Sequence, residues 1–195
     1  MTPVELHRNI RLSSTRVDAG PGATVRGANR GRQLEFHVVG PGGVTHYEGE
    51  SPPAERTSAL DVGVVAAAGD GTKVSRVYVA ERDSDRLLAV DEQSDNESLR
   101  VVGSAALGEP IRYLATDDTR IYAVTEQRVT VLETRSFEGY TAGVIPVIRT
   151  FDFRAALPEG PARSAPVSGI AAGNDRVFVT VSGQPYVVAV AKPRL

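Results

Sequence analysis

The sequence contains no cysteine and no tryptophan, and its 195 residues include one methionine. Without cysteine the chain has no disulfide framework, no zinc–thiolate site and no thiol nucleophile. Without tryptophan it lacks the indole ring on which many lectins stack sugars, which argues against sugar binding.

Long apolar runs and a strong charge of either sign are also missing. No segment approaches the about 20 apolar residues that span a bilayer, and arginine and histidine interrupt residues 1–18 where a signal peptide needs an apolar core. The formal net charge is −2, which gives no electrostatic attraction to nucleic acid or anionic membranes. We expect a cytoplasmic or particle-associated protein that binds neither. The abundance of alanine, glycine, arginine and valine is typical of a high-GC bacterium.

What the chain does contain is a repeat. Four short segments rich in β-branched and aromatic residues begin at Gln33, Arg76, Arg120 and Arg176, at spacings of 43, 44 and 56 residues. This composition is typical of buried strands. Turn-forming Asp, Asn and Gly residues precede the last two segments, so each copy starts with a strand, turns, and returns on a second strand.

Each copy continues with further predicted strands. We expect third strands at residues 44–48, 87–91, 128–133 and 186–191, and fourth strands at 57–60, 99–103 and 147–153. The fourth copy lacks a fourth strand, and residues 5–13 are the candidate to supply it and close a ring. We expect a single domain whose units span about 19–60, 61–108, 109–160, and 161–195 together with 4–14. Helix is predicted only as one turn near 153–157, ahead of Pro158.

The second copy reads Val77-Tyr78-Val79-Ala80, then a hairpin, then a strand ending in Val90-Asp91, and Gly108-Glu109-Pro110 precedes the next inner strand. This pattern resembles the YVTN and NHL-type β-propeller repeats over roughly residues 60–191, although Glu81 stands where the family has asparagine. The resemblance implies an all-β, propeller-like fold with four blades of about four antiparallel strands. Because propellers have about four to eight blades, we consider three arrangements: a closed four-bladed ring, a larger ring completed by a second chain, and an open arc docked on a partner.

The first candidate site lies in the hairpin of the first copy. If residues 40–43 form its loop, His37 lies opposite His46 and Glu35 lies opposite Glu48, with Cβ atoms about 5 Å apart. Two imidazoles and two carboxylates on one face suit Zn²⁺ or another divalent ion. The alternative is a polar face turned to solvent or to a partner, with the carboxylates paired to the histidines or to nearby arginines. A charged face of this kind favours an open arc or a subunit contact.

The second candidate site is the rim formed by the loops between second and third strands and by the loops that enter each inner strand. The resemblance to propeller lactonases, which hold Ca²⁺ or a similar ion on this rim, directs attention to Glu81, Glu109 and Glu126. The alternative is a set of solvated turn residues. The full set of candidate ligand-binding residues on the rim is Glu81, Arg82, Asp83, Glu109, Glu126 and Gln184.

A long Pro- and Gly-containing insertion, residues 154–166, should lie on the same rim. No phosphate-binding loop, zinc-protease motif or nucleophile elbow occurs in the sequence. We therefore expect no catalytic residues and no cofactor beyond a possible Ca²⁺ or Zn²⁺. The leading hypothesis is a non-enzymatic protein-binding or assembly module that binds a protein partner or itself. The alternatives are a small metal-dependent, lactonase-like hydrolase and a structural subunit of a larger particle or enzyme complex.

Overall fold

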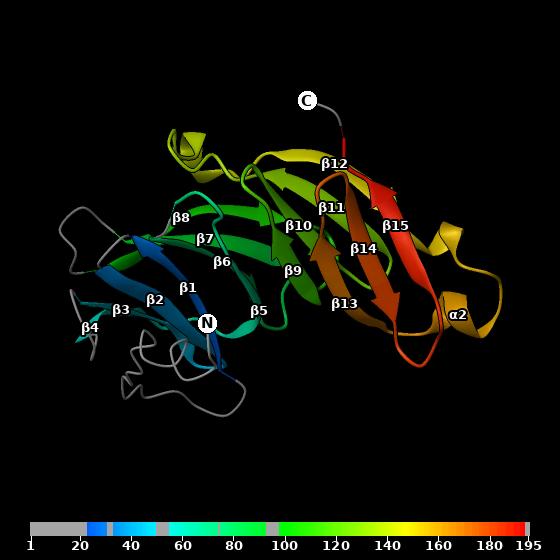
Figure 1. Cartoon of the computed structure of the whole chain (residues 1–195), viewed down its shortest axis with the longest axis horizontal. Helices are drawn as coiled ribbons and strands as arrows, with labels where there is room; N and C mark the ends of the chain where they lie inside the picture. The colour runs from blue at the N-terminus through cyan, green and yellow to red at the C-terminus, as the bar shows by residue number, and fades with distance from the viewer. Residues whose placement is uncertain (1–22, 31–32, 50–54, 74, 93–97, 194–195) are drawn as a thin grey trace, which may run out of the picture.

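The chain folds into four antiparallel β-sheets, which we call blades one to four (Figure 1). The computed structural model describes residues 23–30, 33–49, 55–73, 75–92 and 98–193. Blades one and two consist of β1 (Thr24–Arg30), β2 (Gln33–Gly40), β3 (Gly43–Gly49), β4 (Glu55–Leu60), and β5 (Val64–Gly69), β6 (Arg76–Glu81), β7 (Arg86–Glu92), β8 (Leu99–Ala106). Blades three and four consist of β9 (Tyr113–Thr116), β10 (Arg120–Val124), β11 (Arg128–Glu133), β12 (Val147–Asp152), and β13 (Val167–Ala172), β14 (Arg176–Val181), β15 (Val187–Ala191).

Each blade is a meander in which consecutive strands are neighbours. The first strands β1, β5, β9 and β13 contact one another in that order, so they form the inner edge of the assembly. Blades one and four lie at opposite ends of its long axis, as Figure 1 shows. The predicted all-β, propeller-like fold of four blades is confirmed.

Three apolar clusters between successive blades form the core. One lies between blades one and two and includes Val39, Val77 and Leu88. The second lies between blades two and three around Tyr78 and Ile121. The third, listed by its central members, lies between blades three and four and contains Tyr122, Val124, Val131, Val177, Val179 and Val188. Because a sheet with a neighbour on each side buries both faces, five consecutive residues are buried in β6 (76–80) and in β10 (120–124).

The strands expected from the sequence are present in every blade. The fourth strand of blade one, expected at residues 57–60, is β4. Residues 5–13, the proposed closing strand, lie outside the described residues. The turn expected near 153–157 is a 3₁₀ turn, η2 (Arg154–Ala156), and a second single turn, α2 (Pro161–Ser164), begins with proline at its first position.

The alignment of the first copy needs one correction. When the blades are aligned on the hairpin that joins the second and third strands, His37 of blade one occupies the position of Tyr78 in blade two and of Tyr122 in blade three. The repeat unit of blade one therefore begins at Glu35 and not at Gln33. The hairpin loop of blade one has two residues and is shorter than the loop that follows Glu81 in blade two. Because the loop lengths differ, an alignment by sequence spacing alone does not show the two-residue shift of blade one.

The connection from β11 to β12 fastens blade three to blade two. It contains the 3₁₀ turn η1 (Thr141–Gly143), and the Tyr140 ring beside that turn lies over Gly103 of β8. The Tyr140 hydroxyl is fixed by the Thr134 carbonyl and lies 3.0 Å from the Tyr78 hydroxyl. A Cβ atom on Gly103 would lie 2.4 Å from a Tyr140 ring carbon, so this strand position requires glycine.

Substitution of Gly103 by alanine tests this contact. We expect Gly103→Ala to lower the free energy of unfolding by about 1–3 kcal/mol, because the anchored ring cannot move away. Gly69→Ala is the matched control, since nothing lies within 4 Å of a Cβ at Gly69. Urea denaturation checks both variants. Equal stability of the two would show that the Tyr140 loop adapts freely.

Candidate functional site

One backbone position recurs where successive blades meet. In each blade, the first residue of the second strand pairs with a residue of the third strand, and the position in question directly follows that third-strand residue. It is occupied by Glu92 in blade two, Thr134 in blade three and Lys192 in blade four. The backbone N–H of each donates to the residue that precedes the second strand of its own blade, in turn Ser75, Thr119 and Asp175. Each of the three residues contacts a polar group of the preceding blade, and we call them latch residues.

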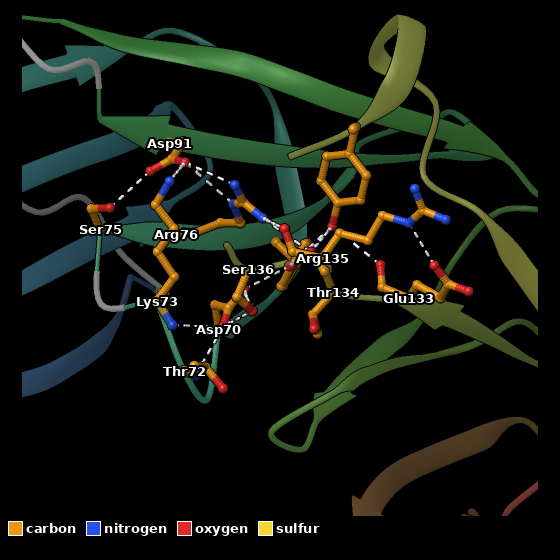
Figure 2. A network of polar contacts seen from close by, with 12 residues as sticks. Asp70, Thr72, Lys73, Ser75, Arg76, Asp91, Glu133, Thr134, Arg135 and Ser136 are labelled. Atoms are coloured by element: carbon orange, nitrogen blue, oxygen red, sulfur yellow. Dashed lines mark hydrogen bonds and ion pairs between the residues drawn. The ribbon is translucent and has the colours of Figure 1, made fainter. Parts of the chain in front are cut away.

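The latch between blades two and three is an uncharged hydroxyl–carbonyl contact backed by ion pairs (Figure 2). The Tyr78 hydroxyl lies 2.9 Å from the Thr134 carbonyl and 2.8 Å from Asp70. Ser136, from the same loop as Thr134, donates to Asp70 at 2.8 Å. Burial, reinforced by Tyr140 and Asp70, raises the pKa of Tyr78, so this hydroxyl stays protonated.

A neighbouring carboxylate in Figure 2, Asp91, is compensated by cations of its own blade. Arg76 lies 3.0 Å from it, Ser75 donates to it at 2.8 Å, and Lys73 lies 2.5 Å away. Burial by itself raises the pKa of Asp91, but the hydrogen bonds from Lys73, Ser75 and Arg76 outweigh burial and hold the pKa below its ordinary value. Arg76 also donates to the Thr134 carbonyl at 3.0 Å, which joins this cluster to the latch.

The latch between blades three and four is a salt bridge. Lys192 contacts the carboxylate of Asp117, and its ammonium lies 5.2 Å from the centre of the Tyr122 ring. Tyr122 donates to the same carboxylate at 2.6 Å. Burial opposes the charge of Asp117, but hydrogen bonds from Lys192, Tyr122 and the Thr119 N–H lower the pKa of Asp117.

The latch between blades one and two is the histidine hairpin of the sequence analysis. The predicted register is confirmed at the backbone, with His37 opposite His46 and Glu35 opposite Glu48. The imidazoles are 1% and 0% exposed, and their ring centres are 4.8 Å apart. The expectation that this face turns to solvent or to a partner is wrong for the two histidines, because Val39 on the same face packs into the core with blade two.

Glu92 of blade two belongs to this cluster and is not among the residues expected there from the sequence. Its Oε1 lies 2.8 Å from Nδ1 of His46, and its side chain is 7% exposed. His46, Glu48 and Glu92 place one potential ligand atom each within 4.8 Å of one another. Of Glu35 the structure describes only the backbone pairing. No local sequence motif points to Glu92, because it belongs to the next repeat. The signal that could have found it is its position in the repeat, which is the position that Lys192 occupies in blade four.

The rim loops lie together as expected, and the insertion lies with them. The Arg82 N–H donates to the Gly63 carbonyl, and the Leu107 N–H donates to the Asp85 carbonyl. Arg154, at the start of the insertion, donates to the backbone carbonyl of Glu126 at 2.6 Å. These bonds join hairpins to the loops that enter each inner strand.

The three rim carboxylates are each engaged with arginine. Glu81 lies 3.4 Å from Arg86, Glu109 lies 3.6 Å from Arg128, and Glu126 lies 3.1 Å from both Arg112 and Arg154. Within the part of the chain that the structure describes, they do not form a group that could share an ion; the group found there is His46, Glu48 and Glu92. Glu109 and Glu126 therefore tie neighbouring loops together, whereas Glu81 closes its own hairpin.

The remaining rim candidates do not converge either. Arg82 lines a pocket of about 410 Å³ beside the inner strands, together with Pro41, Val64 and Tyr113. Asp83 is exposed at the tip of its hairpin with a φ of 55°. The Gln184 N–H donates to the Val181 carbonyl in the next hairpin. Whether these side chains bind a ligand stays a prediction.

One large apolar surface is uncovered. In β14 the residues Val177, Val179 and Val181 are buried against blade three, whereas Phe178 between them is 37% exposed. Val187, paired with Thr180 on the same outer side, is 62% exposed. We call this surface the outer face of blade four; it consists of Ala171, Arg176, Phe178, Thr180, Val187, Ala189 and Ala191.

No protein-family model matches the chain, and no curated protein is similar in sequence. Similar solved structures include BamB from Moraxella catarrhalis (14% identity, TM-score 0.53, 81% of this chain and 46% of that chain). They also include AztD from Citrobacter koseri (15%, 0.57, 88% and 44%) and a candidate 6-phosphogluconolactonase from Bacteroides fragilis (13%, 0.55, 78% and 46%). At these identities the likeness shows the fold alone, a β-propeller type. The chain spans less than half the length of these three proteins.

The salt-bridge latch yields a pH-dependent prediction. We expect Lys192→Met to lower the free energy of unfolding at pH 7 by about 1–2 kcal/mol, because Asp117 loses a charged donor. The pKa of Asp117 is lower in the folded state than its ordinary 3.8. Its contribution is therefore complete above pH 3.8 and is lost as the pH falls through the folded value.

Urea titrations at pH 7 and pH 3 measure this difference, which should shrink at the lower pH. Arg86→Met is the control, since the Arg86–Glu81 pair is largely exposed and such pairs contribute little. An effect of Lys192→Met that is equal at both pH values would contradict the assignment to Asp117.

Proposed function

We propose that this chain is a propeller-type protein-binding and assembly module, with a repeat of the YVTN/NHL kind, and that the outer face of blade four pairs with the same face of a second copy. Such a module acts in the cytoplasm or on a larger particle. The observation that carries the proposal is the apolar side of blade four, which is exposed among the described residues at the position where the other blades bury theirs.

The outer face of blade four has the composition of a blade-stacking face. Phe178 occupies the place of Tyr78 and Tyr122, which are both fully buried against the following blade. Val187 and Ala189 stand at the places of Leu87 and Ala89 in blade two, which are also fully buried. Replacing water by a second apolar sheet at this face gains about 25 cal/mol for each Å² of apolar surface covered.

A second copy of the chain is the partner favoured for the outer face of blade four, because blade one does not offer a similar exposed apolar surface among the described residues. Among the described residues the outward side of blade one is already covered, since Val38 is 5% and Tyr47 is 4% exposed. A second copy therefore finds its matching apolar surface on blade four, and a pair of such faces is self-complementary about a two-fold axis. Arg176 and Asp175 at the border of the face can exchange partners across that axis, because both are exposed.

Light scattering on a sizing column tests the proposal directly. We expect a concentration-dependent dimer of the 20.7 kDa chain. Val187→Glu should shift the protein to monomer, because it places a charge on the apolar face at its most exposed valine. Val147→Glu, at a valine of β12 that is 50% exposed, is the matched control and should leave the dimer intact.

The absence of cysteine allows a second, positional test. Ala189→Cys should form an intermolecular disulfide under mild oxidation, whereas Val147→Cys should not. A persistent monomer over the whole concentration range, or equal cross-linking at both positions, would contradict the paired arrangement. Metal-dependent turnover of a lactone or sugar acid by the purified chain would contradict the non-enzymatic assignment.

A further inference from the structure

We propose that His37, His46, Glu48 and Glu92 form a Zn²⁺-type metal site that joins blade one to blade two. This inference is independent of the dimer proposed above, because the cluster lies at the other end of the arc. It rests on the geometry of the cluster and on a comparison of the three latches.

The fold brings the ligand atoms of His46, Glu48 and Glu92 within 4.8 Å of one another and places the His37 ring beside them. His46 and Glu48 are two residues apart on β3 and so project from the same side of the strand. His37 stands opposite His46 on β2, with 4.8 Å between ring centres. Glu92 at the end of β7 reaches the cluster from blade two, with Oε1 2.8 Å from Nδ1 of His46. The ligands thus come from three strands of two blades.

The charges distinguish this latch from the other two. At the blade three–four interface Asp117 is compensated by Lys192, and in blade two Asp91 is compensated by Lys73 and Arg76. In the histidine cluster two carboxylates lie within 4.8 Å of an imidazole that is fully buried. A divalent cation bound by these atoms would compensate the two carboxylates, as Lys192 compensates Asp117.

The donor set selects the metal. Imidazole nitrogen and carboxylate oxygen, without thiolate, suit Zn²⁺ at bond lengths of about 2.0–2.2 Å, which places tetrahedral ligands about 3.3 Å apart. The contact between His46 Nδ1 and Glu92 Oε1 is already close to that separation. Glu48, which is only half-buried, has the freedom to close the remaining distance. Zn²⁺ binding through Nδ1 of His46 uses the lone pair of that nitrogen, so a proton on Nδ1 moves to Nε2 in a neutral imidazole and leaves for solvent in a protonated one.

A metal at this place acts as a staple for the first blade. Blade one is joined to the rest of the described chain through one apolar cluster and this latch. Ligands from β2, β3 and β7 fix the relative position of the two blades, as structural zinc sites do. We therefore expect metal to slow hydrogen exchange in β2 and β3 and to leave β14 and β15 unchanged.

The test uses the whole chain, freed of metal with a chelator and titrated with Zn²⁺. We expect one bound equivalent by mass spectrometry of the metal content, and a rise in Tm of about 5–10 °C at a hundredfold excess over Kd. Co²⁺ in place of Zn²⁺ should give a visible absorption band typical of imidazole and carboxylate ligation, and this readout needs no variant.

Variants assign the ligands. His46→Ala and Glu92→Gln should each weaken Zn²⁺ binding at least tenfold, and Glu48→Gln should weaken it less, because that side chain has to move to reach the ion. His7→Ala removes the third histidine of the chain and is the matched control, with binding unchanged. Circular dichroism of each variant in its metal-free form shows whether the fold is retained.

Three results would overturn the site. One is no Zn²⁺ or Co²⁺ bound by the wild-type chain, which would assign the cluster to a protonated imidazole paired with Glu92. Another is binding that His7→Ala abolishes and His46→Ala preserves. The last is hydrogen exchange of β2 and β3 that does not respond to metal.

Discussion

The structure depends on one constraint: each apolar sheet face must be covered by another sheet. The clusters around Val77, Tyr78 and Tyr122 satisfy it between successive blades, and the continuous burial of β6 and β10 is its direct consequence. The outer face of blade four does not satisfy it within the described chain. The proposed dimer follows from that imbalance, since exposed Phe178 and Val187 occupy positions whose counterparts are buried.

Apolar packing between two blades sets the distance between their sheets but leaves the sheets able to slide past one another. The directional contacts of the latch residues oppose this sliding. The same backbone position contributes a carbonyl in blade three, an ammonium in blade four and a carboxylate in blade two. The partner on the preceding blade changes with it, from Tyr78 to Asp117 to His46. The repeat therefore preserves the location of the contact and varies its chemistry, which is how a metal site can arise at one interface of a repetitive fold.

The rim illustrates the opposite outcome. Glu81, Glu109 and Glu126 are polar residues on adjacent loops, which is the sequence pattern of a metal-binding rim, yet each is paired with an arginine. Arg154 joins the insertion to Glu126 and is itself buried, so the longest loop of the rim is tied to blade three. Spacing in the sequence does not reveal the partners of Glu109 and Glu126, because those partners come from different loops.

The sequence alone determined the strands, the number of repeats and the register of the first hairpin. These follow from local alternation, turn residues and a two-residue loop, all of which act over a few residues. Only the tertiary structure decided which side of each strand is covered: it buried His37 and His46, brought Glu92 to them from another repeat, and left Phe178 exposed. The physical reason is that burial and charge compensation depend on the neighbouring blade, and no residue within a strand encodes which neighbour it will meet.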